Sequence, residues 1–282
     1  MALIQWYPGH IAKAERELKE QLKRVDVVLE VLDARIPLAS HHPQVPQWIG
    51  SKPRLLILNR MDMIPEETCQ AWLAWFRGQG VEVFSANAKL GTGIKAISKA
   101  AQKAGQSVNE RRQQRGMQPR AVRAVVMGFP NVGKSALINR LLGRKVVESA
   151  RRAGVTRQLR WIRISDTIEL LDSPGVIPLK LDNQADAVKL AICEDIGEAA
   201  YDNQRTAIAL IHLLGQLGLD AILAQRYQWE LAGQSAEDYL ASLAEQRYQQ
   251  DQERAARQLL NDFRKGLMGP LPLELPPANG EG

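Results

Sequence analysis

The segment Gly128-Phe-Pro-Asn-Val-Gly-Lys-Ser135 has residue types and a spacing that can bind a polyphosphate. It fits the pattern G-x-x-x-x-G-K-[ST], with an apolar, β-prone run before it at 121–127 and a helix-like run after it at 136–142. In that context backbone N–H groups and the positive end of a helix surround the phosphate oxygens. Lys134 would reach the β- and γ-phosphates, and the Ser135 hydroxyl could hold Mg²⁺. We therefore expect a nucleoside triphosphate as ligand and Mg²⁺ as cofactor.

A second polar segment, Asn59-Arg-Met-Asp62, follows an apolar run at 53–58 and fits N-K-x-D with Arg60 in place of lysine. In this pattern the Asp accepts from two N–H groups of guanine that adenine lacks, and the Asn joins this loop to the phosphate loop. After a predicted strand at 81–84, Ser85-Ala-Asn87 fits the S-A-[KN] loop that meets guanine O6. Each motif is weak alone, but together, at the ends of successive strands, they indicate guanine.

Two further motifs lie downstream of the phosphate loop. Thr156, in a glycine-containing basic loop, is a candidate Mg²⁺ ligand, and Asp172-Ser-Pro-Gly175 fits D-x-x-G. Asp172 would reach the ion through water, and the Gly175 amide would contact the γ-phosphate. The full predicted nucleotide-binding set is Asn59, Arg60, Asp62, Ser85, Ala86, Asn87, Asn131, Val132, Gly133, Lys134, Ser135, Ala136, Thr156 and Gly175.

The order of these motifs is unusual, because the guanine motifs come before the phosphate loop. We interpret this as a circular permutation in which residues 105–119, polar and rich in arginine, are an exposed linker joining the two halves. The predicted fold class is α/β: a circularly permuted P-loop GTPase domain over 1–196, with a mostly parallel sheet and helices on both faces, then a small all-α domain over 197–268. The proline-rich tail at 269–282 is predicted to be disordered.

The periodicity of apolar residues predicts the elements that position the motifs. Strands are expected at 25–32, 53–58, 81–84, 121–127, 159–164 and 167–171. Helices are expected at 11–24, 66–79, 91–104, 136–142, near 185–192, and at 204–227, 235–247 and 251–265, with a capping box at Ser235 and Asp238.

Composition narrows the class of protein. The chain has 282 residues and two cysteines, Cys69 and Cys193, which suit a reducing cytosol. The longest apolar stretch, 207–224, contains His212, Gln216 and Asp220, and the first residues lack a basic region followed by an apolar one. We therefore expect no membrane span and no signal peptide.

Charge is distributed unevenly along the chain. Residues 111–163 contain fourteen Lys and Arg against one acid, whereas residues 196–282 contain seven against twelve. A single triphosphate does not need so many cations, so RNA is a reasonable partner, although a solvated arginine-rich surface remains an alternative. In the acidic C-terminal part, Arg247, Arg254, Arg257, Arg264 and Lys265 could line one face. Its aromatic residues Tyr227, Trp229, Tyr239 and Tyr248 are better explained by core packing than by base stacking.

Taken together, the chain resembles the circularly permuted GTPases of the YlqF/YawG group. The resemblance rests on Trp6-Tyr-Pro-Gly-His-Ile-Ala-Lys-Ala14, Asp33-Ala-Arg-Ile-Pro37, the phosphate loop and Leu171-Asp-Ser-Pro-Gly-Val176. It implies a cytoplasmic GTPase that binds the large ribosomal subunit late in assembly, contacts its rRNA through both domains, and hydrolyses GTP faster once bound. We expect GTP and GDP as ligands, no membrane partner, and a monomer.

The resemblance also indicates two catalytic features. Where many GTPases have a water-orienting glutamine, this chain has Val176, which can neither donate nor accept, and the resemblance indicates His10 for that role. From the residues alone His10 is an ordinary loop histidine. Asn131 suggests a K⁺ site, because in GTPases with Asn at this position of the phosphate loop that side chain helps to hold a K⁺ ion; an Asn that only tolerates the loop backbone is the alternative. For Asp33 and Arg35 a structural ion pair or turn is the favoured interpretation.

Two other functions remain open at this point. One is a GTPase switch acting on a different RNA or protein target. The other is an RNA-binding scaffold with weak hydrolysis, which Val176 suggests and which the intact Lys134, Ser135, Thr156 and Asp172 argue against.

Overall fold

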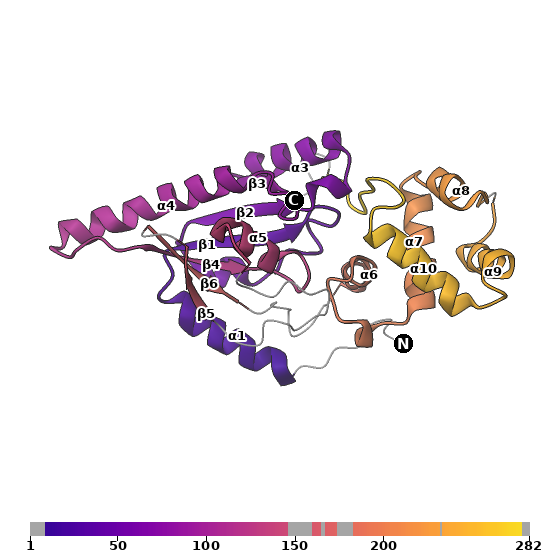
Figure 1. The fold of residues 1–282 in the computed structure, drawn as a ribbon, viewed down its shortest axis with the longest axis horizontal. Coiled ribbons are helices and arrows are strands. Elements are labelled where there is room, and N and C mark those ends of the chain that lie inside the picture. Colours follow the sequence, from indigo (N-terminus) through magenta and orange to yellow (C-terminus); the bar gives the residue numbers. More distant parts are fainter. Residues whose placement is uncertain (1–8, 146–159, 165–166, 174–182, 232, 278–282) are drawn as a thin grey trace.

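A six-stranded sheet with the order β3-β2-β1-β4-β6-β5 forms the centre of the larger part of the molecule (Figure 1). The structure is a computed structural model that describes residues 9–145, 160–164, 167–173, 183–231 and 233–277. The strands are β1 Val27–Asp33, β2 Arg54–Asn59, β3 Glu82–Ala86, β4 Val122–Met127, β5 Arg160–Arg163 and β6 Ile168–Asp172. Neighbours pair in parallel, except for the edge strand β5, which is antiparallel to β6. The parallel strands consequently all end at one edge.

Helices cover both faces of this sheet, as the sequence predicts. One face carries α1 Gly9–Leu22, α2 Val45–Ile49 and α3 Glu66–Gly78, and the other carries α4 Ile94–Gln114 and α5 Lys134–Leu142. Along β1, Val28 packs toward α1 while Val27 and Leu29 pack toward the opposite face. Burial on both faces explains why the parallel strands read as unbroken apolar runs rather than alternating ones.

A helical region follows the sheet in the chain. It consists of α6 Gln184–Cys193, α7 Asn203–Gln216, α8 Ala221–Tyr227, α9 Ala236–Arg247 and α10 Gln252–Arg264, with a 3₁₀ turn, η2 Glu198–Ala200, between α6 and α7. A second 3₁₀ turn, η1 Met61–Met63, follows β2. The single helix predicted at 204–227 is instead two, because the chain turns at Gly218, whose φ is 67°. The predicted cap is confirmed: Ser235 accepts from the Asp238 amide at 3.0 Å. No helix among the described residues is long and apolar enough to cross a membrane.

The prediction of an exposed linker at 105–119 is wrong for its first ten residues, which continue α4. The buried positions Ile94, Ile97, Ala101 and Gly105 form one helical stripe. A Cβ on Gly105 would lie 2.2 Å from a methyl carbon of Val122. The glycine therefore marks a close crossing of α4 over β4, and not a flexible break as its sequence context suggests.

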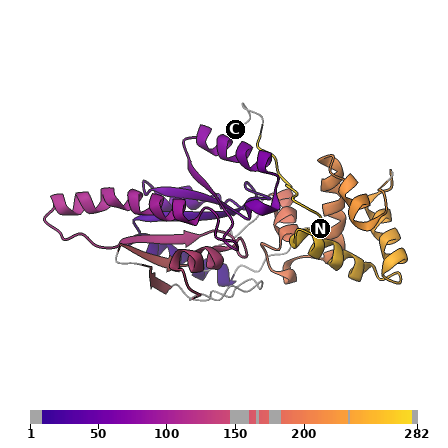
Figure 2. The same cartoon turned by 45° about the horizontal axis from the view of Figure 1, so that its top comes forward.

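The predicted disordered tail also differs from the structure, because residues 268–275 pack against the sheet part of the molecule. We call these residues the C-terminal strap; they follow α10 and return toward α3 (Figures 1 and 2). Leu271 N donates to Met63 O at 2.8 Å and Leu273 N donates to Arg35 O at 2.9 Å, and both leucine side chains are buried. Apolar side chains alternating with prolines let an extended segment bury surface without forming a helix or strand.

Glu274 anchors this strap. Its carboxylate accepts from Leu38 N at 2.7 Å and Ala39 N at 3.2 Å and pairs with Lys189 Nζ at 2.9 Å. Burial raises the pKa of Glu274, and Lys189 and the two amides oppose that shift.

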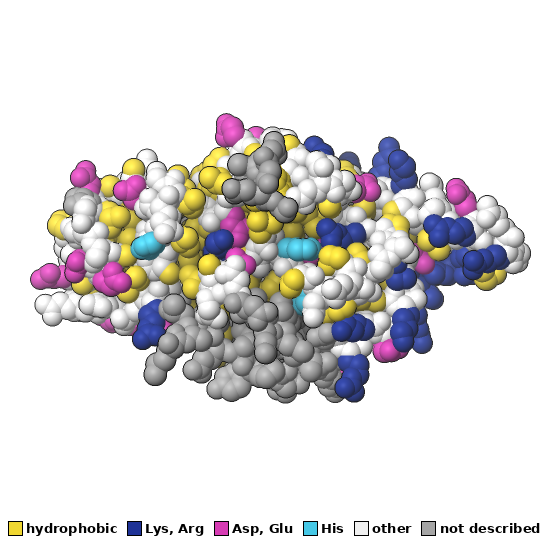
Figure 3. All heavy atoms as spheres, turned by 180° about the vertical axis from the view of Figure 1, so that it is seen from behind, with side chains coloured by type: hydrophobic (Ala, Val, Ile, Leu, Met, Phe, Trp, Pro, Cys, Tyr) yellow, Lys and Arg dark blue, Asp and Glu magenta, His cyan; other side chains and the backbone are white. Residues whose placement is uncertain are grey.

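The two ends of the molecule differ in charge. Viewed from behind, Lys and Arg side chains gather at the end where α4 finishes, and Asp and Glu side chains are prominent at the helical end (Figure 3). The asymmetry read along the sequence is thus also an asymmetry in space.

Replacing Glu274 should test how much the strap contributes to stability. Glu274→Ala leaves the partly buried Leu38 amide, the buried Ala39 amide and the Lys189 ammonium without their acceptor, so we expect the free energy of unfolding to fall by about 2–3 kcal/mol, a shift of several degrees in Tm. Thermal unfolding followed by circular dichroism measures it. The matched control is Leu275→Ala, at an adjacent side chain that is 55% exposed and should cost little. Equal Tm values for the two variants would contradict the anchoring role.

Candidate nucleotide-binding site

The phosphate loop lies at the carboxyl edge of the sheet, between β4 and α5. Its glycines are required by close contacts: a Cβ on Gly128 would lie 2.3 Å from Val31 O, and one on Gly133 would lie 2.1 Å from Asn59 Nδ2. Gly128 and Gly133 have positive φ, and so does Asn131, at 57°. The loop is therefore pressed against the ends of β1 and β2 in a conformation that larger side chains would prevent.

Lys134 is buried inside this loop. Its ammonium donates to Phe129 O at 2.6 Å and Gly128 O at 3.1 Å. Burial lowers the pKa of Lys134 to about 8, against the opposing effect of the Asp172 and Asp195 carboxylates. The negative charge of a bound phosphate would favour the ammonium form, as the motif requires.

The Mg²⁺ side of the predicted site is partly described. Ser135 is half-buried in the first turn of α5, and Asp172 is buried at the carboxyl end of β6, paired with Val126 of β4. The next residue, Ser173, donates to Val126 O at 2.6 Å and fixes the start of the D-x-x-G segment. Hydroxyl and carboxylate oxygens are the donors that Mg²⁺ prefers, so these two residues fit the ion. Thr156 and Gly175 lie outside the described residues.

Asn59 joins the two halves of the site. Its Nδ2 donates to Val132 O in the phosphate loop at 2.7 Å, and its Oδ1 accepts from Ala88 N, just after the predicted guanine loop, at 3.0 Å. The sequence predicts the first of these contacts. Asn87 stabilises the same turn by accepting from Leu90 N at 2.9 Å, while Ser85 and Ala86 end β3. Asp62 lies exposed in η1, directly beyond the carboxyl end of β2.

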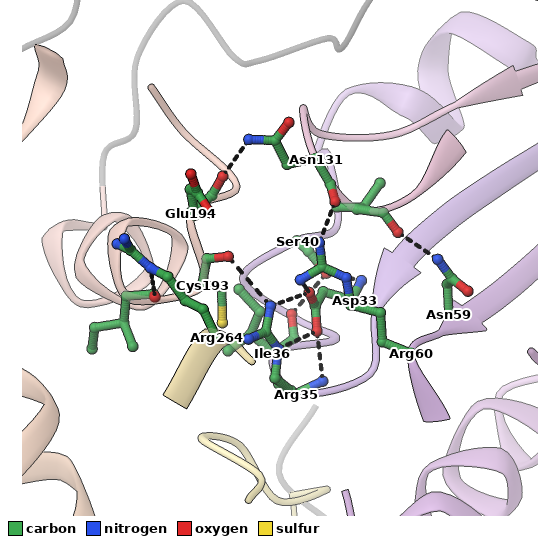
Figure 4. Close-up of polar contacts among 12 residues, drawn as sticks. Asp33, Arg35, Ile36, Ser40, Asn59, Arg60, Asn131, Cys193, Glu194 and Arg264 are labelled. Atoms are coloured by element: carbon green, nitrogen blue, oxygen red, sulfur yellow. Dashed lines mark hydrogen bonds and ion pairs between the residues drawn. The ribbon is translucent and has the colours of Figure 1, made fainter. Parts of the chain in front are cut away.

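Arg60 makes contacts that a lysine could not make together. It adopts a left-handed conformation with a φ of 63°. One guanidinium nitrogen donates to Asp33 at 2.9 Å and the other donates to the Asn131 carbonyl oxygen in the phosphate loop (Figure 4). The motif N-K-x-D has lysine at this position. Because a guanidinium donates in several fixed directions, the arginine adds a link between the guanine loop, β1 and the phosphate loop.

Asp33 is the centre of a buried ion cluster. Arg35 donates to it through Nε at 2.9 Å and Nη2 at 2.7 Å, and that same Nη2 donates to Cys193 O at the end of α6 at 3.3 Å (Figure 4). Burial alone would raise the pKa of Asp33, but Arg35 and Arg60 hold it below its usual value. The interpretation of Asp33 and Arg35 as a structural ion pair is confirmed.

The turn after α6 meets the phosphate loop directly. Asn131 Nδ2 donates to Glu194 O at 2.7 Å, and Glu194 itself has a φ of 64° (Figure 4). The next residue, Asp195, is fully buried, and neither of its carboxylate oxygens has a hydrogen-bond partner among the described residues. Burial raises the pKa of Asp195 to about 8; Asp33 adds to this, and Arg60, Arg35 and Lys134 oppose it. Sequence reasoning missed this residue, because an acid after a helix normally signals a solvated end.

Among the described residues the structure thus brings the guanine loops, the phosphate loop, Lys134 and Asp172 to one edge. His10 lies in the first turn of α1 rather than in a loop, and its side chain is outside the described part. α1 begins on the side that faces the helical region (Figure 1).

Residues 123–241 match a protein-family model described as 50S ribosome-binding GTPase. The chain is 33% identical to ribosome biogenesis GTPase A of Bacillus cereus, in an alignment that covers 99% of this chain and 96% of the relative. It is 38% identical to ribosome biogenesis GTPase A of Priestia megaterium, over 75% of this chain and 74% of the relative. Its fold is similar to that of the crystal structure of GNP-bound YlqF from T. maritima, with a TM-score of 0.64 over 94% of this chain and 98% of that one, at 24% identity.

The buried carboxyl of Asp195 should make stability depend on pH. Its pKa is about 8 in the folded state and near 3.8 otherwise, so between these values the folded state binds a proton that the unfolded state releases. Stability is therefore lost as pH rises through this window. Asp195→Asn removes the effect and should raise Tm by several degrees at pH 8.5, equivalent to about 1 kcal/mol or more, with little change at pH 4.

Thermal melts of both proteins over this pH range measure the difference. Glu198→Gln, at an exposed acid nearby, removes the same charge and serves as the control. A Tm advantage of Asp195→Asn that is identical at both pH values would show that the carboxyl does not titrate in this window.

Proposed function

The chain belongs to the family of ribosome biogenesis GTPase A, and from this premise we propose that it acts late in the maturation of the large ribosomal subunit and binds its rRNA. As a member of this family it is a GTPase, converting GTP to GDP and phosphate. We further propose that it works in the cytoplasm and as a monomer, with residues 1–196 as its GTPase domain and 197–268 as its helical domain.

One observation supports the nucleotide site above the others. Asn59 contacts Val132 in the phosphate loop and Ala88 just after the predicted guanine loop, which supports a common pocket for Asp62 and Lys134. In the proposed complex Asp62 reads the guanine base and Lys134 stabilises charge on the β- and γ-phosphates. Backbone groups of the other predicted binding residues surround the rest of the nucleotide.

Ser135 and Thr156 would hold Mg²⁺, with Asp172 acting through water. When bound, this ion neutralises charge on the transferring phosphate. The Gly175 amide would contact the γ-phosphate.

The group that orients the attacking water is proposed to be His10. Val176 offers no donor or acceptor for this task. α1 starts on the side of the sheet that faces the helical region, where the parallel strands also end. A histidine carried at the start of this helix could orient the attacking water at the γ-phosphate when the ribosome is bound.

Purified large ribosomal subunits should accelerate GTP turnover, and His10→Ala should remove that acceleration. Loss of a positioned general base or water-orienting group costs about 10²-fold or more, whereas GTP affinity should not change. His212→Ala, at an exposed histidine on α7, is the matched control. Stimulated turnover that survives in His10→Ala would exclude this role.

The same assay separates the rival functions. Stimulation by large subunits, with GTP-dependent co-sedimentation, supports an assembly factor. A GTPase switch on another target would show neither, and a scaffold with weak hydrolysis would co-sediment without being stimulated.

Potassium is proposed as a second cofactor, held in part by Asn131. The amide nitrogen of this side chain points to Glu194, so its amide oxygen is turned away from that turn (Figure 4). An amide oxygen is a suitable ligand for a monovalent cation, which would add positive charge where other GTPases use an arginine finger.

Turnover should therefore be at least about tenfold faster in KCl than in NaCl at equal ionic strength, since an added cation in this position replaces part of the effect of an arginine finger. Asn131→Gly keeps the positive φ of 57° accessible and removes the side chain, so it should abolish the difference between the two salts. GDP affinity, measured in parallel, controls for damage to the loop. Equal wild-type rates in both salts would refute the potassium site.

A further inference from the structure

A cavity lies at the end of the sheet opposite the nucleotide site. It has a volume of about 340 Å³ and is lined by Arg24, Arg123, Trp161, Arg163 and Glu169. Arg123 lies at the start of β4, whereas the phosphate loop follows the end of that strand. Glu169 likewise lies at the start of β6, whereas Asp172 ends it. The length of the sheet therefore separates this cavity from the nucleotide.

The described residues that line the cavity present three guanidinium groups and one carboxylate. Glu169 contacts Arg123 Nε at 3.3 Å, and the Arg123 guanidinium lies 5.6 Å from the centre of the Trp161 ring. These two contacts fix the orientation of Arg123. Arg24 and Arg163 are exposed, and the structure gives the Arg24 side chain no hydrogen bond or ion pair with a described residue. The site has a net positive charge, with one arginine held in place by its neighbours.

The surroundings extend this charge. The last turn of α4 carries Arg111 and Arg112, and Arg115 follows it, at the same end of the sheet, which is the end where Lys and Arg gather in Figure 3. By contrast, Arg120 is fully engaged by the two oxygens of Asp26, at 2.7 and 2.9 Å. A long anion crossing this end would meet several cations in succession.

Several basic side chains of the helical region are used within the protein. Arg264 donates to the carbonyl oxygens of Ala191 and Ile192, Arg226 pairs with Asp262, and Arg257 pairs with Glu253. Because these guanidiniums already have partners inside an acidic region, the helical region is a poor candidate for the main electrostatic contact with a polyanion.

We infer that the cavity of Arg24, Arg123, Trp161 and Arg163 binds the phosphodiester backbone of RNA, at a site separate from the nucleotide pocket. Guanidiniums donate to phosphate oxygens in pairs, and their planes and the indole edge can also contact a ribose or base. A volume of about 340 Å³ is enough for a nucleotide unit, and a phosphate ion alone would not need it. The inference rests on the proposed function, since it names where that function contacts RNA.

The test is equilibrium binding of purified large-subunit rRNA to the full chain across 50–200 mM salt. Arg24→Ala combined with Arg163→Ala should weaken binding at least about tenfold and reduce the slope of log K against log salt by about two, because each lost phosphate contact reduces it by nearly one. Both side chains are exposed and remote from the nucleotide, so basal GTP turnover should not change. The matched control, Arg254→Ala with Arg257→Ala on α10, removes the same charge from the opposite end and should retain most of the affinity.

Glu169→Gln provides a second variant with the opposite expectation. Among the described residues it removes the only carboxylate that lines the cavity, so RNA binding should strengthen severalfold. Thermal melts establish that each variant is folded.

The outcomes separate this inference from the proposed function. If wild type binds rRNA and large subunits, and Arg24→Ala with Arg163→Ala binds with the same affinity and salt slope, the cavity is not the contact and the proposed function stands. If wild type binds neither in any nucleotide state, the proposed function fails as well. If poly-glutamate binds the wild type as tightly as rRNA does, and this binding is lost in the same variant, the ligand is an acidic polypeptide instead.

Discussion

The buried carboxylate of Asp33 is the interaction on which the rest of the site depends. A charge removed from water must be paired, and Asp33 is paired with both Arg35 and Arg60. Through Arg35 it is linked to the end of α6, and through Arg60 to the phosphate loop. The arrangement of β1, β2, the phosphate loop and α6 is therefore fixed by one ion cluster, and removing Asp33 would leave the fully buried Arg35 guanidinium without its counter-ion.

The cluster also explains how the nucleotide site and the helical region can influence each other. Asn131 in the phosphate loop donates to Glu194 in the turn that ends α6, and the Arg35 guanidinium lies 5.1 Å from the ring of Phe263 in α10. The C-terminal strap adds a hydrogen bond to Met63, next to Asp62. The helical region thus touches the elements that would hold the base and the phosphates, so a change in nucleotide has direct contacts through which to act.

Charge separates the molecule into two ends with different chemistry. At the carboxyl edge of the sheet Lys134 is buried and Arg60 is partly buried, and both donate to carbonyl oxygens of the phosphate loop. At the amino edge the cations are exposed and outnumber the acids, as Arg24 and Arg163 illustrate. A buried cation holds a small ligand in a defined geometry, whereas exposed cations attract an extended polyanion at the cost of strong sensitivity to salt.

The sequence by itself determined the motifs, their permuted order and the strands that carry them, because each depends on a few neighbouring residues and a local apolar pattern. It also determined that Asn59 would meet the phosphate loop. Only the tertiary structure decided that Gly105 marks a close crossing of α4, that residues 268–275 pack, that Arg60 and Arg35 share Asp33, and that Asp195 is buried. These features arise from contacts between residues far apart in the chain. At each of these positions the local propensity and polarity predict a different structure, so a short segment of sequence is not enough to predict them.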